Sequence, residues 1–167
     1  MILAFSGTRR GLTAYQRRNL VTCLAALPER LFHGGAVGAD EEVDALLAPL
    51  YWESERRRGA ILDPPEGIEY PIVVYPASIE RRRYWTRDVR FSAVREIEDP
   101  RPPLDRNRII ARCADRLLAA PATLTEILRS GTWATVRYAH AAGRPVTILL
   151  PWPVPWSETG IVEELDR

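Results

Sequence analysis

Short apolar runs alternate along this chain with helix-length segments, and glycine-bearing loops join several runs to the segment that follows. The runs cover residues 2–5, 31–33, 72–75, 115–121 and 146–151. Four segments of helical periodicity lie between them, beginning near residues 13, 40, 106 and 130. Runs that are apolar throughout are typical of parallel strands covered on both faces. We therefore expect an α/β fold, Rossmann-like and doubly wound, with a mostly parallel sheet of about five strands and helices on both faces.

Local signals refine two of the helical segments. Thr13 and Gln16 have the spacing of a capping box, which predicts the start of the first helix. Pro49 lies inside the second helical segment and is expected to break or kink it.

The chain divides into one domain and a tail. Residues 1–151 should form the domain, interrupted by an Arg-rich, aromatic loop over 77–104 that is too long for a plain connection. Residues 152–167 form a tail rich in Trp and Pro, and we expect Trp152 and Trp156 to pack it back onto the domain.

Composition excludes several classes of protein. A chain of 167 residues with 46% hydrophobic residues is long enough to bury a core. The run over 2–5 is too short for a secretory signal, and no run approaches the roughly 20 residues that span a bilayer. Cys23 and Cys113 show no CxxC spacing, and no histidines cluster, so we expect no metal, no cofactor and no membrane partner. These features favour a cytoplasmic protein with reduced, buried thiols.

The net charge alone does not indicate a binding partner. The net charge is +1, which provides no general attraction to nucleic acid or to an anionic membrane. All 23 basic residues are arginine, so Schiff-base chemistry and the P-loop lysine are excluded.

Ligands of doubly wound sheets bind at the carboxyl ends of the strands, and four loops with polar or glycine-rich chemistry are expected at that edge. They are residues 7–11, residues 34–40, the segment that ends in Arg106 and Asn107, and residues 130–135. The candidate ligand-binding residues in these loops are Gly7, Thr8, Arg9, Gly34, Gly35, Gly38, Asp40, Arg106, Asn107, Gly131, Thr132 and Thr135.

Phosphate binding is the chemistry that these loops suggest first. The glycines of residues 34–38 have main-chain N–H groups that a phosphate oxygen can reach, at the start of a helix. Gly131 and Thr132 form the better cradle, because the acidic residues from Asp40 onward would repel an anion. Arg9 and Arg106 are the natural charge partners of a phosphate, although each has a surface ion pair as its alternative.

Several other side chains have both a structural and a functional interpretation. Asp40 is a helix cap or a ligand of a sugar hydroxyl, and Asn107 is a cap or a reader of a base or ribose edge. His33 is a general base or, as we favour, a structural hydrogen-bonding residue at the end of a buried strand. Trp85 in the long loop and Trp133 beside the last cradle are candidates for stacking on a base.

Five motifs together resemble one known superfamily. They are SGTRR at 6–10, HGGAVGAD at 33–40, DRNRIIARCADRLLAA at 105–120, SGTWATVRYA at 130–139 and GRPVTILLP at 143–151. In order and spacing they resemble the SLOG superfamily and, within it, the YspA-like branch, over residues 2–151. Its relatives include DNA-processing protein A and the LOG phosphoribohydrolases. The resemblance implies a Rossmann-like domain that binds a nucleotide or a nucleotide-derived ligand, and it implies a homodimer.

Three functions follow from this resemblance. The favoured one is binding of a nucleotide-like small molecule. The second is cleavage of a nucleotide N-glycosidic bond, although Thr135 stands where the LOG pattern has its catalytic glutamate. The third is binding of single-stranded DNA, for which the segment over 81–91, with its arginines and aromatics, is the candidate surface. The near-zero net charge makes nucleic acid a possible partner that we do not favour.

Overall fold

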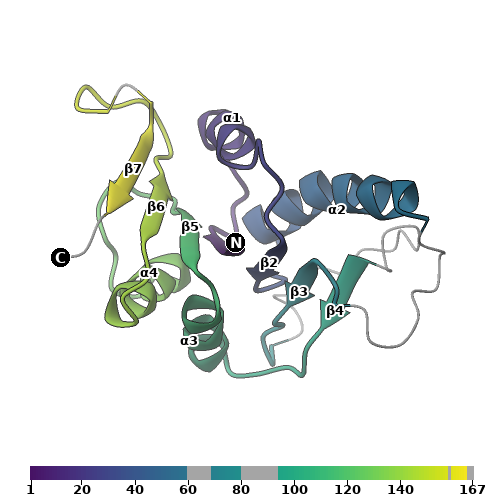
Figure 1. Ribbon diagram of the computed structural model, residues 1–167. Coiled ribbons are helices and arrows are strands. Elements are labelled where there is room, and N and C mark those ends of the chain that lie inside the picture. Colours follow the sequence, from purple (N-terminus) through teal and green to yellow (C-terminus); the bar gives the residue numbers. More distant parts are fainter. Residues whose placement is uncertain (60–68, 80–93, 158, 165–167) are drawn as a thin grey trace.

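The computed structural model describes residues 1–59, 69–79, 94–157 and 159–164, which form one seven-stranded sheet and four helices (Figure 1). The strand order is β4-β3-β2-β1-β5-β6-β7. The strands are β1 (Ile2–Gly7), β2 (Arg30–His33), β3 (Ile72–Val74), β4 (Arg95–Ile97), β5 (Arg116–Ala120), β6 (Val146–Leu149) and β7 (Ile161–Glu164). All neighbouring pairs are parallel except β6 and β7, which are antiparallel. The expected Rossmann-like fold is confirmed.

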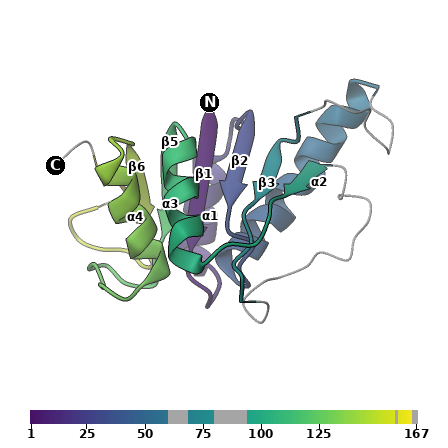
Figure 2. The same ribbon diagram turned by 90° about the horizontal axis from the view of Figure 1, so that it is seen from below.

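Helices cover both faces of the sheet. They are α1 (Ala14–Cys23), α2 (Ala39–Arg57), α3 (Pro103–Cys113) and α4 (Gly131–Ala141). Leu20 of α1 and Leu47 of α2 are buried in the core on one face, whereas Ile110 of α3 and Val136 of α4 belong to the core on the other. Seen from below, α3 and α4 lie on the near side of the sheet (Figure 2).

The strand order reverses beside β1. From β1 the chain moves outward through β2 and β3 to β4, and α3 then leads it back across to β5 on the other side of β1. The loops that follow β1 and β5 therefore diverge toward opposite faces, which opens a crevice at the carboxyl ends of these two strands.

The sheet has two strands more than expected, one at each edge. β4 lies inside the stretch expected to be an irregular loop, where buried Val94 and an ion pair of 2.8 Å between Arg95 and Asp44 of α2 anchor it. β7 lies in the expected tail and pairs with β6 over four residues. Both strands are short and carry charged residues, so neither has the apolar run that marks the central strands.

Two local expectations concern the helices. The capping box at the start of α1 is confirmed, since the Thr13 hydroxyl accepts from the amide of Gln16 and the Gln16 side chain accepts from the amide of Thr13. Pro49 does not break α2, which continues through it to Arg57, and the alternative of a kink stays a prediction. The cost of one missing N–H donor is offset by the burial of Ala48 and Tyr51 beside it.

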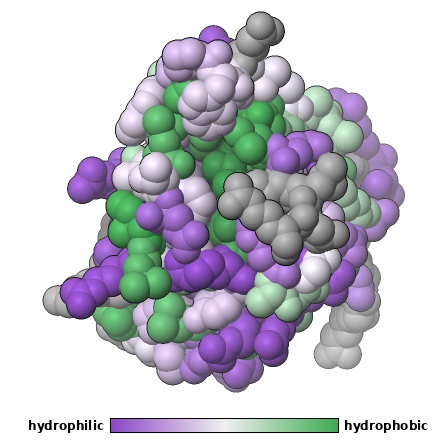
Figure 3. Space-filling model, turned by 90° about the vertical axis from the view of Figure 1, so that its left-hand side faces the viewer, coloured by the Kyte–Doolittle hydropathy of each residue, from purple (hydrophilic) through white to green (hydrophobic). Residues whose placement is uncertain are grey.

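The tail attaches through its strand rather than through its tryptophans. Trp152 and Trp156 are 48% and 65% exposed, so their expected packing onto the domain is wrong. Val154 is a buried side chain of this segment. On this side of the molecule, hydrophobic residues gather in the upper centre and down the left of the view, and hydrophilic residues lie between and below them (Figure 3).

Both cysteines are free thiols, but the expectation that both are buried is wrong. Cys113 is exposed near the end of α3, and Cys23 is partly buried. Burial raises the pKa of the Cys23 thiol. Among the described residues, no helix combines the length and the apolar character that crossing a bilayer requires.

Candidate functional site

A cleft of about 850 Å³ lies where the strand order reverses, and we call it the central cleft. The loops after β1 and β5, the start of α3 and the start of α4 line it. Nine of the candidate residues lie on its walls, namely Gly7, Thr8, Arg9, Gly34, Asp40, Arg106, Asn107, Gly131 and Thr132. The structure therefore brings together residues from all four predicted loops, and ligand binding by these residues stays a prediction.

Three candidate residues lie behind the walls of the central cleft. The amide of Gly35 donates to His33 Nδ1 at 3.2 Å. Gly38 has a φ of 95° and lies so close to the Arg9 carbonyl that an added Cβ would come within 2.6 Å of it. Thr135 is fully buried, and its hydroxyl binds the Gly131 carbonyl. These residues hold the loops together from behind.

Asp40 organises two of the loops. Its carboxylate accepts from the amide of Gly7 at 3.3 Å, from that of Gly34 at 3.1 Å and from that of Ala36 at 3.2 Å. Only 5% of the residue is exposed. The Gly34 and Gly35 amides, which the sequence suggests as phosphate ligands, are thus already hydrogen-bonded within the chain. Asp40 fills the position of an anion between the loop after β1 and the loop after β2.

Arg106 crosses the floor of the cleft from α3. Its Nη1 donates to the carbonyl oxygens of Gly34 and Tyr75, and its Nε is buried without a partner among the described residues. Burial lowers the pKa of the guanidinium, and the nearby Asp40 carboxylate opposes that shift. The guanidinium is therefore positioned by the main chain rather than neutralised by an ion pair.

The start of α4 presents main-chain donors to the cleft. Ser130 caps the helix, with its hydroxyl accepting from the amide of Trp133. The amides of Gly131 and Thr132 have no acceptor among the described residues, and both residues line the cleft. Asn107 donates to the Gly131 carbonyl at 3.1 Å and so fixes this end of the helix. Unpaired N–H groups at a helix start favour an anion.

Arginines dominate the charge of the cleft. The described residues that line it include Arg9, Arg10, Arg106, Arg129 and Arg137, with Asp40 as the one acidic residue. The side chains of Arg9, Arg10 and Arg129 make no hydrogen bond or ion pair with described residues. Sequence reasoning missed Arg10, Arg129 and Arg137. The signal for the first two was their position directly beside Arg9 and Ser130.

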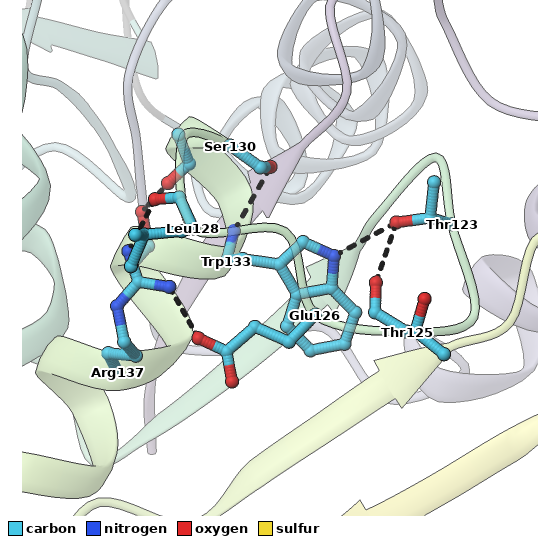
Figure 4. A network of polar contacts seen from close by, with 9 residues as sticks. Thr123, Thr125, Glu126, Leu128, Ser130, Trp133 and Arg137 are labelled. Carbon is cyan, nitrogen blue, oxygen red and sulfur yellow. Dashed lines mark hydrogen bonds and ion pairs between the residues drawn. The ribbon is translucent and has the colours of Figure 1, made fainter.

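The loop between β5 and α4 is held by side-chain hydrogen bonds (Figure 4). Trp133 Nε1 donates to the Thr123 hydroxyl at 3.1 Å, which itself donates to the Thr125 carbonyl at 2.9 Å. Arg137 donates to the carboxylate of Glu126 and to the carbonyl of Leu128. Trp133 is 6% exposed, so its expected stacking on a base is wrong.

His33 has the structural position that we favoured. It is fully buried at the end of β2, and it does not line the central cleft. Burial lowers the pKa of its imidazole, while Asp44 and Asp40 oppose that shift. Trp85 and the arginine-rich segment 81–91 lie outside the described residues.

Comparison with known proteins supports the fold. DNA processing protein A from Helicobacter pylori, described in a study of its single-stranded DNA binding mode, matches 95% of this chain and 69% of its own with a TM-score of 0.55 and 18% identity. No family model and no curated protein sequence matches the chain. The protein therefore has a fold like that of DNA processing protein A, and the narrower YspA-like assignment stays a proposal.

Proposed function

We propose that this protein binds single-stranded DNA, with backbone phosphates held in the central cleft. The observation that carries the proposal is the group of five arginines around the cleft against one aspartate. Guanidinium groups and helix N-termini are the usual protein ligands of backbone phosphates. The fold shared with DNA processing protein A supports this choice, and it ranks above the small-molecule reading that the sequence alone favoured.

The small net charge does not oppose this proposal, because part of the positive charge elsewhere is paired with carboxylates while arginines at the cleft are not. On the exposed side of α2, Arg56 and Arg57 both bind Glu53, and Arg58 binds Glu55. By contrast, Arg9 and Arg129 at the cleft have no carboxylate partner among the described residues. A protein of net charge +1 thus still has unpaired arginines at the cleft, and such cations steer a polyanion to a groove.

A free nucleotide or nucleotide-derived ligand is the second candidate. The cleft volume of about 850 Å³ falls within the range of small-molecule sites, and the unpaired amides of Gly131 and Thr132 suit a single phosphate. Hydrolysis of such a ligand has less support. Glu126 is bound by Arg137, and Asp40 already accepts three amide hydrogens. Both carboxylates are therefore engaged in holding loops.

Fluorescence anisotropy with a labelled oligothymidine tests the proposal. We expect binding whose affinity falls with salt, with a slope of about 0.7 per phosphate contact on a logarithmic scale. Arg129→Ala should weaken binding and reduce that slope by about one contact. Arg112→Ala is the matched control, because it removes the same charge from an exposed position on α3 that does not line the cleft.

Two results would separate the candidates. Displacement of the labelled strand by a mononucleotide at equal nucleotide concentration would favour the small-molecule reading. Equal losses in Arg129→Ala and Arg112→Ala would mean that the cleft does not hold the strand. The homodimer implied by the resemblance stays a prediction, and light scattering of the same samples measures it.

A further inference from the structure

The central cleft has an apolar rim as well as an arginine-rich floor. Leu104 at the start of α3 is 54% exposed, and Ile127 and Leu128 in the loop before α4 are 45% and 79% exposed. All three line the cleft. Single exposed apolar residues are common on proteins, but several that border one charged cleft indicate a contact surface.

The rim is held in its exposed position. Arg137 donates to the main-chain carbonyl of Leu128 at 3.0 Å and binds the carboxylate of Glu126 two residues earlier. The amide of Ser130 donates to the carbonyl of Ile127 at 3.0 Å, which closes the turn. With its backbone fixed from both sides, Leu128 projects from a braced turn, where collapse onto the core would break these bonds.

We propose that this rim, formed by Leu104, Ile127 and Leu128, is a nucleobase subsite. The inference rests on the proposed function and deepens it. A ligand that satisfies both parts of the cleft must carry negative charge toward the arginines and a flat apolar face toward the rim. A nucleotide unit of a single strand has that shape, with its phosphate near Arg129 and the α4 start and its base against the leucines.

The chemistry of the rim also sets its selectivity. Leucine and isoleucine side chains have no hydrogen-bond donor or acceptor, so they contact the face of a base without reading its edge. The subsite therefore distinguishes strands that carry bases from strands that lack them, and it accepts thymine, cytosine and adenine with similar affinity. It excludes duplex DNA, whose bases are stacked and paired.

The subsite is tested by measuring how two DNA ligands bind to three proteins. The ligands are an oligothymidine and the same backbone with abasic spacers, and the proteins are the parent, Leu128→Ala and Leu50→Ala. Leu50 is an exposed leucine of α2 outside the cleft and serves as the control. We expect Leu128→Ala to weaken the base-bearing strand about fivefold, as when roughly half a leucine side chain is buried on binding. Binding of the abasic strand should stay unchanged.

A further variant, Leu128→Phe, tests for a gain of affinity, because an aromatic face stacks on bases better than an aliphatic side chain. The variant should bind the base-bearing strand more tightly and the abasic strand as the parent does. Equal binding of both strands by the parent would overturn the subsite while leaving the proposed function standing. Binding of neither strand by the parent would overturn the proposed function and the subsite with it. Equal losses on both strands in Leu128→Ala would show that the residue contacts backbone or shapes the loop.

Discussion

Replacing Asp40 by asparagine separates a structural role for this carboxylate from a role in ligand binding. One carboxylate oxygen accepts from the Gly7 amide, and the other accepts from the amides of Gly34 and Ala36. An asparagine oxygen can replace only the second, so its NH₂ group would face the partly buried Gly7 donor. We expect the free energy of unfolding to fall by about 2 to 4 kcal/mol, from one unsatisfied donor and two weakened charge-assisted bonds. Urea denaturation followed by fluorescence measures this loss.

The same variant should bind single strands at least as well as the parent, because the cleft loses the one acidic residue that lines it among those described. Asp105→Asn is the control, since Asp105 is an exposed acid of α3 that pairs with Arg108. Binding is compared at a temperature where all the proteins are folded. Unchanged stability together with a tenfold loss of binding would refute the structural role and restore the interpretation of Asp40 as a ligand of a sugar hydroxyl.

Three further predictions follow from buried and strained positions. Because burial lowers the pKa of His33, the unfolded chain binds the proton more readily, so the unfolding free energy should fall as the pH drops below about 6.5, by at most about 1.4 kcal/mol per pH unit. His33→Asn, which keeps an acceptor for the Gly35 amide, should lose this dependence between pH 5.5 and 7.5, and an unchanged slope would exclude His33 as its source. Gly38→Ala should destabilise the protein by about 1 to 3 kcal/mol more than Gly143→Ala. Both glycines have a positive φ, but only at Gly38 would an added Cβ meet backbone atoms. Equal urea midpoints for the two variants would contradict this prediction. In native protein, Ellman's reagent should modify exposed Cys113 well before Cys23, whose thiol pKa is raised by burial. Mass spectrometry identifies the modified residue, and modification of Cys23 before Cys113 would contradict this prediction.

The central part of the fold could be predicted from the sequence, because β1, β2, β3, β5 and β6 are apolar and glycine-bearing loops or helical segments separate them. The edge strands could not. β4 depends on a buried ion pair between Arg95 and Asp44, and the partners are 51 residues apart in the sequence. A pattern of apolar residues contains no information on such a pair. Edge strands also need only one apolar face, which a stretch of three or four residues does not reveal.

The sequence predicted which loops form the site, but not which of their residues line the cleft and which lie behind it. Gly34 and Gly38 look alike in the motif HGGAVGAD, yet Gly34 lines the cleft and Gly38 separates two backbone segments behind it. Their difference depends on how the loops pack against each other, which no local signal reports. Arg137 was missed for a similar reason, because within α4 it looks like a solvated helix residue, and only the tertiary structure places it on the preceding loop.

Photo-crosslinking tests directly whether a DNA strand lies in the central cleft. An oligothymidine that carries 4-thiothymidine at single positions is bound to the protein, and the complex is irradiated at long wavelength. The complex is then digested with a protease, and the crosslinked peptides are identified by mass spectrometry. We expect crosslinks to peptides that contain residues 7–10, 104–107 and 127–137, and fewer of them in Leu128→Ala. Crosslinks confined to the arginine-rich segment 81–91, or to the outer side of α2, would contradict it.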